Sequence, residues 1–329
     1  MSQILRANAF SLTILMIGLA ASLATADDDA TFKLVRLTPP DQFCSYSGYS
    51  TSPENADGTL ISYTKFPDKP TDGKWGKDAE IWVCDRDGGN HRKVADVAND
   101  NVHNGAEVNW IDDTFATARN VKVGDEVGSA VLNMRTGEVV HGPYVGLHII
   151  HEAVNGRAIG MVVRDDAPMA EGIWTVDVRT GEATHLLSKR DLLPWKDKMK
   201  GGSDDIDDWG ISHPEWSPSG EYFAFVLFHN WKRGYQFFYT ADGEFHEYFG
   251  GKLSHPNWVD DEHVFGGHRG KTVLAKLDGT IVKTVAGPSA HPALSPDGNW
   301  ITTETKWGTP TVTIVRYPWG STKAQVIDK

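Results

Sequence analysis

The chain has 329 residues, of which 40% are hydrophobic and 23% charged, an ordinary composition for a globular protein with a large core. Its formal net charge of −12 argues against a nucleic-acid partner, which would favour a basic face. An anionic substrate stays open, because a local basic or metal site can outweigh a distant negative field.

The first 26 residues have the pattern of an export signal. Arg6 supplies a positive charge, Phe10 to Ala21 form a short apolar run, and Ala24-Thr25-Ala26 fits a cleavage site. The run is short for a membrane span, which needs about 20 residues. We therefore expect cleavage after residue 26, a mature chain of residues 27–329 that is periplasmic or secreted, and no later membrane span.

The mature chain reads as a series of short strands separated by Asp-Gly and Thr-Gly turns. Thr59 to Tyr63 alternates as a strand, and Glu80 to Val94 reads as two strands around an Asp-Gly-Gly turn. Similar units recur about every 40 residues, as in WD40-like propellers. This pattern predicts an all-β fold, one β-propeller domain of six four-stranded blades, with seven blades as the alternative. Thr31 to Leu37 is a leftover strand that we expect to join the last blade and close the ring.

The two cysteines, Cys44 and Cys84, fall in or just before the first unit. Export would allow a disulfide, whereas two buried thiols are the alternative. The sequence does not give the Cα separation that decides between them.

The longest insert runs from Ser188 to Gly210 and carries both basic and acidic residues. Its plain interpretation is a solvated surface loop of mixed charge. The alternative is a rim or lid over the channel mouth, because long loops in compact domains are often functional.

A histidine-proline pair opens the fourth, fifth and sixth units. The histidines are His213, His255 and His291, and an aromatic or apolar residue follows three positions after each. In a propeller the first strand of every blade lines the central channel, so residues in equivalent positions meet there. We therefore expect these three imidazoles to lie together.

The same register extends to earlier units. Glu107 stands three residues before Trp110 in the second unit, and the third unit offers His148 or His151 at a looser register. His103 lies just before Glu107, where it could stand at the channel mouth. We take His151 and His103 as additional channel candidates.

Three imidazoles and one carboxylate form a donor set that suits Zn²⁺, Mn²⁺ or Fe²⁺. We take His255, His291 and Glu107 as candidate ligands of a divalent metal cofactor, with Mn, Zn or Ca as the candidate ions. In the alternative interpretation His-Pro is a strand-start motif, and its imidazoles bond backbone groups.

The repeats resemble those of periplasmic propellers with SPDG-type turns, the TolB-like group; Ser295 to Gly298 is one such turn. The last three units, from ISHPEW to SAHPALSPDG, also resemble those of oligogalacturonate lyases and, more distantly, ulvan lyases. The first resemblance implies a propeller, and the second implies a lyase.

The lyase resemblance assigns residues by position. It implies that His213 is the catalytic base and that His255 and His291 are metal ligands. Two further ligand positions of that family are occupied here by Ala286 and Ser289, so the family's full metal site is not present. The family also uses an arginine ahead of its late blades, and Arg190 lies at about that place.

The chemistry that this resemblance implies is β-elimination on acidic, uronate-containing oligosaccharides. A neutral histidine is a suitable base for the proton beside a uronate carboxylate, and a metal or cation must balance the charge that develops. Two alternatives remain: a non-catalytic TolB-like propeller that binds a protein or glycan at its channel face, and a propeller with a structural ion.

Overall fold

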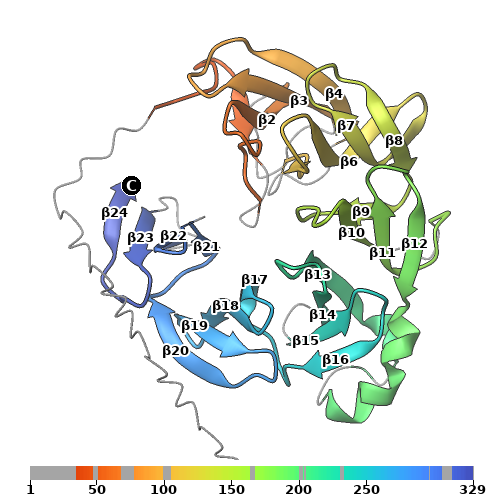
Figure 1. The fold of residues 1–329 in the computed structure, drawn as a ribbon, viewed down its shortest axis with the longest axis vertical. Coiled ribbons are helices and arrows are strands. Elements are labelled where there is room, and N and C mark those ends of the chain that lie inside the picture. The colour runs from red at the N-terminus through yellow and green to blue at the C-terminus, as the bar shows by residue number, and fades with distance from the viewer. Residues whose placement is uncertain are drawn as a thin grey trace, which may run out of the picture. The chain divides into compact units, whose positions relative to one another are not determined.

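Strands dominate the computed structural model, whose described residues are 35–46, 51–67, 78–98, 105–163, 167–199, 203, 205–229, 233–295, 297–305 and 313–328. They belong to one unit, residues 35–329, whereas residues 1–34, the predicted signal segment included, form a separate unit outside the described part. Within the described residues, 24 strands form six antiparallel blades around a common axis (Figure 1). The predicted six-bladed β-propeller is confirmed.

Each blade has four strands, from the innermost to the outermost. The first three blades are β1 (Phe43–Ser45), β2 (Leu60–Phe66), β3 (Asp78–Asp85) and β4 (Arg92–Ala98); β5 (Asn109–Trp110), β6 (Phe115–Val123), β7 (Glu126–Asn133) and β8 (Val139–Tyr144); and β9 (Leu147–Ile149), β10 (Arg157–Val162), β11 (Gly172–Asp177) and β12 (Ala183–Leu187). The last three are β13 (Gly210–Trp216), β14 (Tyr222–His229), β15 (Arg233–Thr240) and β16 (Phe245–Tyr248); β17 (Ser254–Asp260), β18 (His263–His268), β19 (Lys271–Lys276) and β20 (Ile281–Ala286); and β21 (Ala293–Leu294), β22 (Trp300–Thr305), β23 (Thr313–Pro318) and β24 (Gln325–Asp328). A single bridge, Val97 to Val121, links the first two blades into one sheet.

The described part of the sixth blade takes all four strands from the C-terminal region of the chain. Of the expected closing strand, residues 31–34 lie outside the described part, and residues 35–37 form no strand. The segment still packs on the first blade, because Leu37 lies against Gly88 in the turn between β3 and β4.

That contact belongs to a repeated pattern. The glycine in the turn between the third and fourth strands of these blades has positive φ. A Cβ added to Gly137 would lie 2.8 Å from the Val94 carbonyl oxygen, and one added to Gly279 would lie 2.3 Å from the Phe249 carbonyl oxygen. Each of these carbonyls belongs to or follows the outer strand of the preceding blade. At Gly88 the carbonyl of Leu37 takes this role, at 3.2 Å. Only glycine allows both the left-handed conformation and the close approach.

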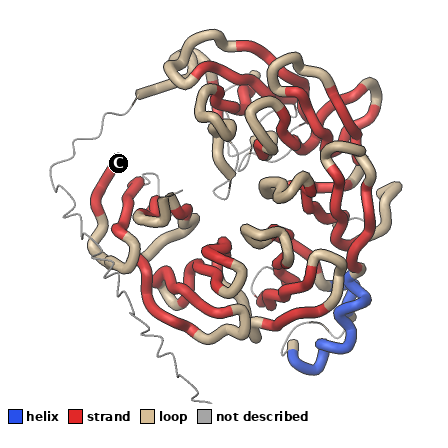
Figure 2. Tube along the Cα trace, viewed as in Figure 1, coloured by secondary structure: helices blue, strands red, loops and turns tan. Residues whose placement is uncertain are grey.

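The insert after the third blade forms two 3₁₀ helices, η1 (Lys189–Lys198) and η2 (Ile206–Asp208). They lie on the outer side of the ring beside β12 and β16 (Figure 2). Trp195 packs on Phe245 and Tyr248 of β16, at 4.1 and 5.8 Å between ring centroids. The insert therefore covers the edge of the fourth blade and not the channel mouth. No helix in the described ranges is long and apolar enough to cross a membrane.

The two cysteines are free thiols on one face of the first blade. Cys44 of β1 lies opposite Lys65, and Cys84 of β3 lies opposite Ile61, at the other end of β2. Two strand spacings and this offset along β2 put their Cα atoms roughly 16 Å apart. A disulfide needs less than about 7 Å, so this register excludes one.

Candidate functional site: the histidines of the channel

A β-bulge interrupts the inner strand of both the fourth and the fifth blade at the His-Pro pair. In β13 the pairing shifts between Ser212 and Glu215, and in β17 it shifts between Ser254 and Asn257. Inside the bulges His213 has φ 52° and His255 has φ 48°. Positive φ is uncommon outside glycine, and a bulge re-aims the side chain that it contains.

The second blade repeats this backbone shape. Glu107 precedes β5 with φ 46°, three residues before the buried Trp110. The side-chain amide of Asn109 donates to the Glu107 carbonyl at 3.0 Å, and the amide of Asn257 donates to the His255 carbonyl at 3.2 Å. Glu107, His213 and His255 therefore hold equivalent positions, as the spacing of the tryptophans predicted.

Four histidines from four consecutive blades lie side by side. The ring centroids of His151 and His213 are 6.3 Å apart, those of His213 and His255 are 6.2 Å apart, and those of His255 and His291 are 4.2 Å apart. The inner strands of these blades, β9, β13, β17 and β21, surround the propeller axis in Figure 1. The structure thus brings together the three His-Pro histidines, and His151 is the histidine of the third blade that lies beside them.

Burial favours the neutral form of three of these imidazoles, those of His151, His213 and His255. It lowers the pKa of His151 to about 3, with a contribution from His213. The pKa of His213 falls to about 4 through burial, Lys252 and His291, and the pKa of His255 falls to about 4 through burial and the neighbouring His291 and His213. Neutral imidazole is the form that accepts a proton or binds a metal.

Hydrogen bonds fix the orientation of two of the rings. Nδ1 of His255 lies 2.7 Å from the carbonyl oxygen of Ala290, which can only accept, so Nδ1 carries the proton and Nε2 is the basic nitrogen. Nδ1 of His291 pairs with the carboxylate of Glu304. Burial raises the pKa of Glu304, but its hydrogen bonds to His291 and to the backbone, together with its electrostatic interaction with His291, outweigh burial, so the pKa lies below the usual range.

This arrangement fits metal-binding histidines in part. Ligating imidazoles commonly donate their second nitrogen to a carbonyl or a carboxylate, as His255 and His291 do. The carboxylate of Glu107, by contrast, pairs with Arg119 at 2.9 Å. Among the residues that the structure describes, no group of three or more His, Cys, Asp or Glu is disposed to hold a metal ion.

Lys252 is a residue of the site that the sequence did not single out. It lies between β16 and β17, and its side chain crosses β15 at Gly234, where an added Cβ would come within 2.4 Å of the lysine Cδ. Its ammonium group lowers the pKa of His213 and of His255. Burial lowers the pKa of Lys252 itself. The histidines therefore have a cation beside them.

Arg190 does not lie with the histidines. It is exposed and pairs with Asp207 of η2 at 2.9 Å. Its helix, η1, lies on the outer side of the ring (Figure 2). The physical reason is the apolar side of the insert, where Leu192 and Trp195 dock on the third and fourth blades and carry η1 to the outside. The arginine expected beside the base is thus on the periphery, and Lys252 provides the nearby cation.

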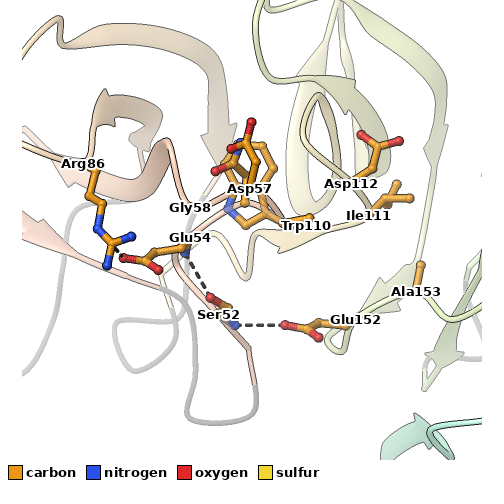
Figure 3. Close-up of a pocket in the computed structure, with 12 residues that line it drawn as sticks. Ser52, Glu54, Asp57, Gly58, Arg86, Trp110, Ile111, Asp112, Glu152 and Ala153 are labelled. Atoms are coloured by element: carbon orange, nitrogen blue, oxygen red, sulfur yellow. Dashed lines mark hydrogen bonds and ion pairs between the residues drawn. The ribbon is translucent and has the colours of Figure 1, made fainter. Parts of the chain in front are cut away.

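A pocket of about 530 Å³ lies between the first three blades, and one of its lining residues, Glu152, interacts electrostatically with Glu215 of β13. Glu152 lines this pocket and accepts a hydrogen bond from the backbone amide of Ser52 at 3.0 Å, which joins the third blade to the first (Figure 3). Burial raises the pKa of Glu215 to about 8, and Glu152 raises it further. His103, the other channel candidate, lies outside the described residues.

No protein-family model and no curated protein matches this chain. Among solved structures it is similar to an oligogalacturonate lyase in complex with manganese, with 15% identity over 86% of this chain and 77% of that one, and a TM-score of 0.57. It is also similar to the propeller domain of the Trilobed protease from Pyrococcus furiosus, which has an open velcro topology (11% identity, 87% and 81% coverage, TM-score 0.53). TolB from Acinetobacter baumannii matches with 13% identity over 82% of this chain and 65% of that one, and a TM-score of 0.48. At these identities the likeness shows the fold alone: the chain is a β-propeller.

Proposed function

We propose that the protein is an exported propeller enzyme that cleaves acidic, uronate-containing oligosaccharides by β-elimination. The observation that carries the proposal is the convergence of His151, His213, His255 and His291 beside Lys252. Further support comes from the fold shared with a manganese-bound oligogalacturonate lyase and from the export pattern of residues 1–26.

His213 is the proposed base. It removes the proton at C5 of the uronate, the C–H electron pair becomes the C4–C5 double bond, and the C4–O bond breaks as its oxygen takes a proton from solvent. Lys252 binds the substrate carboxylate and balances the charge that develops on it. Once that carboxylate neutralises the ammonium, the electrostatic penalty on protonated His213 falls, so substrate binding raises the pKa of the base.

His255 and His291 are the residues that would hold a divalent metal. Their Nδ1 partners, Ala290 and Glu304, orient both rings and make Nε2 the ligating nitrogen. A bound ion would supply Lewis-acid stabilisation of the uronate carboxylate. Glu107 has no part in this assignment, because its carboxylate pairs with Arg119.

The test is a cleavage assay on uronate oligosaccharides, oligogalacturonate first, followed by the ultraviolet absorbance of unsaturated products. We expect activity in the wild type, a loss of about 10²–10⁴-fold in His213→Ala, and little change in His246→Ala, which removes an exposed histidine of β16. Metal content measured in parallel should fall in His255→Ala and in His291→Ala. Absence of products from every uronate tested, with and without Mn²⁺, would favour a binding propeller for a glycan or protein partner.

A further inference from the structure

Glu107, His213 and His255 have positive φ, and the residue two positions after each of them is placed to bond its carbonyl group. In the second and fifth blades this residue is an asparagine whose amide donates to the carbonyl of the positive-φ residue, from Asn109 to Glu107 and from Asn257 to His255, and the Asn257 amide also donates to the carbonyl of Pro292 at 3.1 Å. Because the bulge takes that carbonyl out of the regular ladder, the side-chain donor replaces a backbone donor.

In the fourth blade Glu215 stands at this position. The register is the same, since Glu215 pairs with Ala224 directly after the bulge at His213, as Asn257 pairs with Phe265 after the bulge at His255. An ionised carboxylate only accepts hydrogen bonds, and it would repel the carbonyl oxygen, whereas a protonated carboxyl donates one.

The surroundings of Glu215 favour its neutral form. The charged group that acts on it is the carboxyl of Glu152, which accepts a hydrogen bond from the backbone amide of Ser52 at 3.0 Å. His213 lies on its own strand, and Arg157 of β10 is turned to the ring of Trp216, 4.5 Å away. Burial and Glu152 together raise the pKa of Glu215 to about 8.

We propose that Glu215 is a positioning residue whose carboxyl keeps its proton and donates it to the carbonyl of His213, which holds the bulge that turns the imidazole into the channel. The role of His213 as base rests on the proposed function, but the hydrogen bond that holds its bulge does not. Glu215 thus does in the fourth blade what asparagine does in the second and fifth.

The test compares thermal unfolding of the wild type and Glu215→Gln between pH 5 and 9. Glutamine keeps a donor and cannot ionise. When folding raises the pKa of an acid, the protein loses stability as pH rises from the pKa of that acid in the unfolded chain, here near 4.3, to its pKa in the folded protein. We therefore expect a small Tm advantage for Glu215→Gln at pH 5 that grows by about 5 °C or more up to pH 8 and then stays constant.

Two further variants make the test specific. Glu221→Gln removes an exposed carboxylate of the same blade and should show no such trend. Glu215→Leu, which has no donor, should unfold below both other proteins already at pH 5. A Tm difference between Glu215→Gln and the wild type that is independent of pH would overturn the proposal. These readouts need no lyase activity, so the proposal can fail while the proposed function stands, and the reverse.

Discussion

Replacing Gly279 with alanine should destabilise the fifth blade by clashing with the fourth. Gly279 has φ 86°, and its added Cβ would lie 2.3 Å from the Phe249 carbonyl oxygen. The left-handed conformation costs a residue with Cβ roughly 1–2 kcal/mol. Relieving the clash requires a backbone shift, which we place at another 1–3 kcal/mol from the typical cost of overpacking.

Gly270 is the matched control. It has φ 77° in the same blade, and no atom lies within 4 Å of its added Cβ. Gly270→Ala should therefore lose about 1–2 kcal/mol, and Gly279→Ala about 2–5 kcal/mol. Urea unfolding of both variants at one pH gives the two values. Equal losses would refute the reasoning, because the contact with the fourth blade would then contribute nothing.

Three further outcomes are expected. Lys252→Met should raise KM for uronate oligosaccharides. It should also raise the pKa of His213 from about 4, but not to the value of a free imidazole, because burial still lowers it; NMR titration of the metal-free protein measures this pKa. Lys189→Met should cost about 2–3 kcal/mol in urea unfolding, because Lys189 is 6% exposed and pairs with Glu171 at 2.8 Å, so its removal leaves a partly buried carboxylate unpaired. Trp195→Ala should release η1 from the fourth blade, raise amide exchange there and leave lyase activity unchanged, whereas a loss of activity would give the insert a role at the site.

The sequence alone was sufficient to predict the six blades and the equivalent positions of the histidines within them. Trp216 and Trp258 fixed the equivalence of His213 and His255, because a buried aromatic residue at a constant offset reports which face of a strand is inside. The bulge that reverses this alternation was not visible, since no local pattern demands positive φ at a histidine.

Contacts between residues of different strands could not be predicted from the sequence, because they depend on how the strands pair. Arg119 meets Glu107, and Glu304 meets His291, only because their strands pair in a particular register. Arg190 was expected near the base from its place in the chain, but the apolar residues of its own helix decide where it lies. Lys252 carries no motif, and only the path of its loop over β15 brings it to the site.

The glycine contacts join the turn between the third and fourth strands of one blade to the outer strand of the preceding blade. The contact that repeats around the ring therefore lies between neighbouring sheets and not within one sheet. Backbone meets backbone at Gly137 and Gly279, so adjacent blades match without any particular side chain, and their sequences can diverge while the ring keeps its angle. The first blade receives its contact from Leu37 and not from a blade strand. A circular permutant that begins at the second blade would therefore have to carry residues 35–38 to the end of the sixth, or its first blade would lose its neighbour.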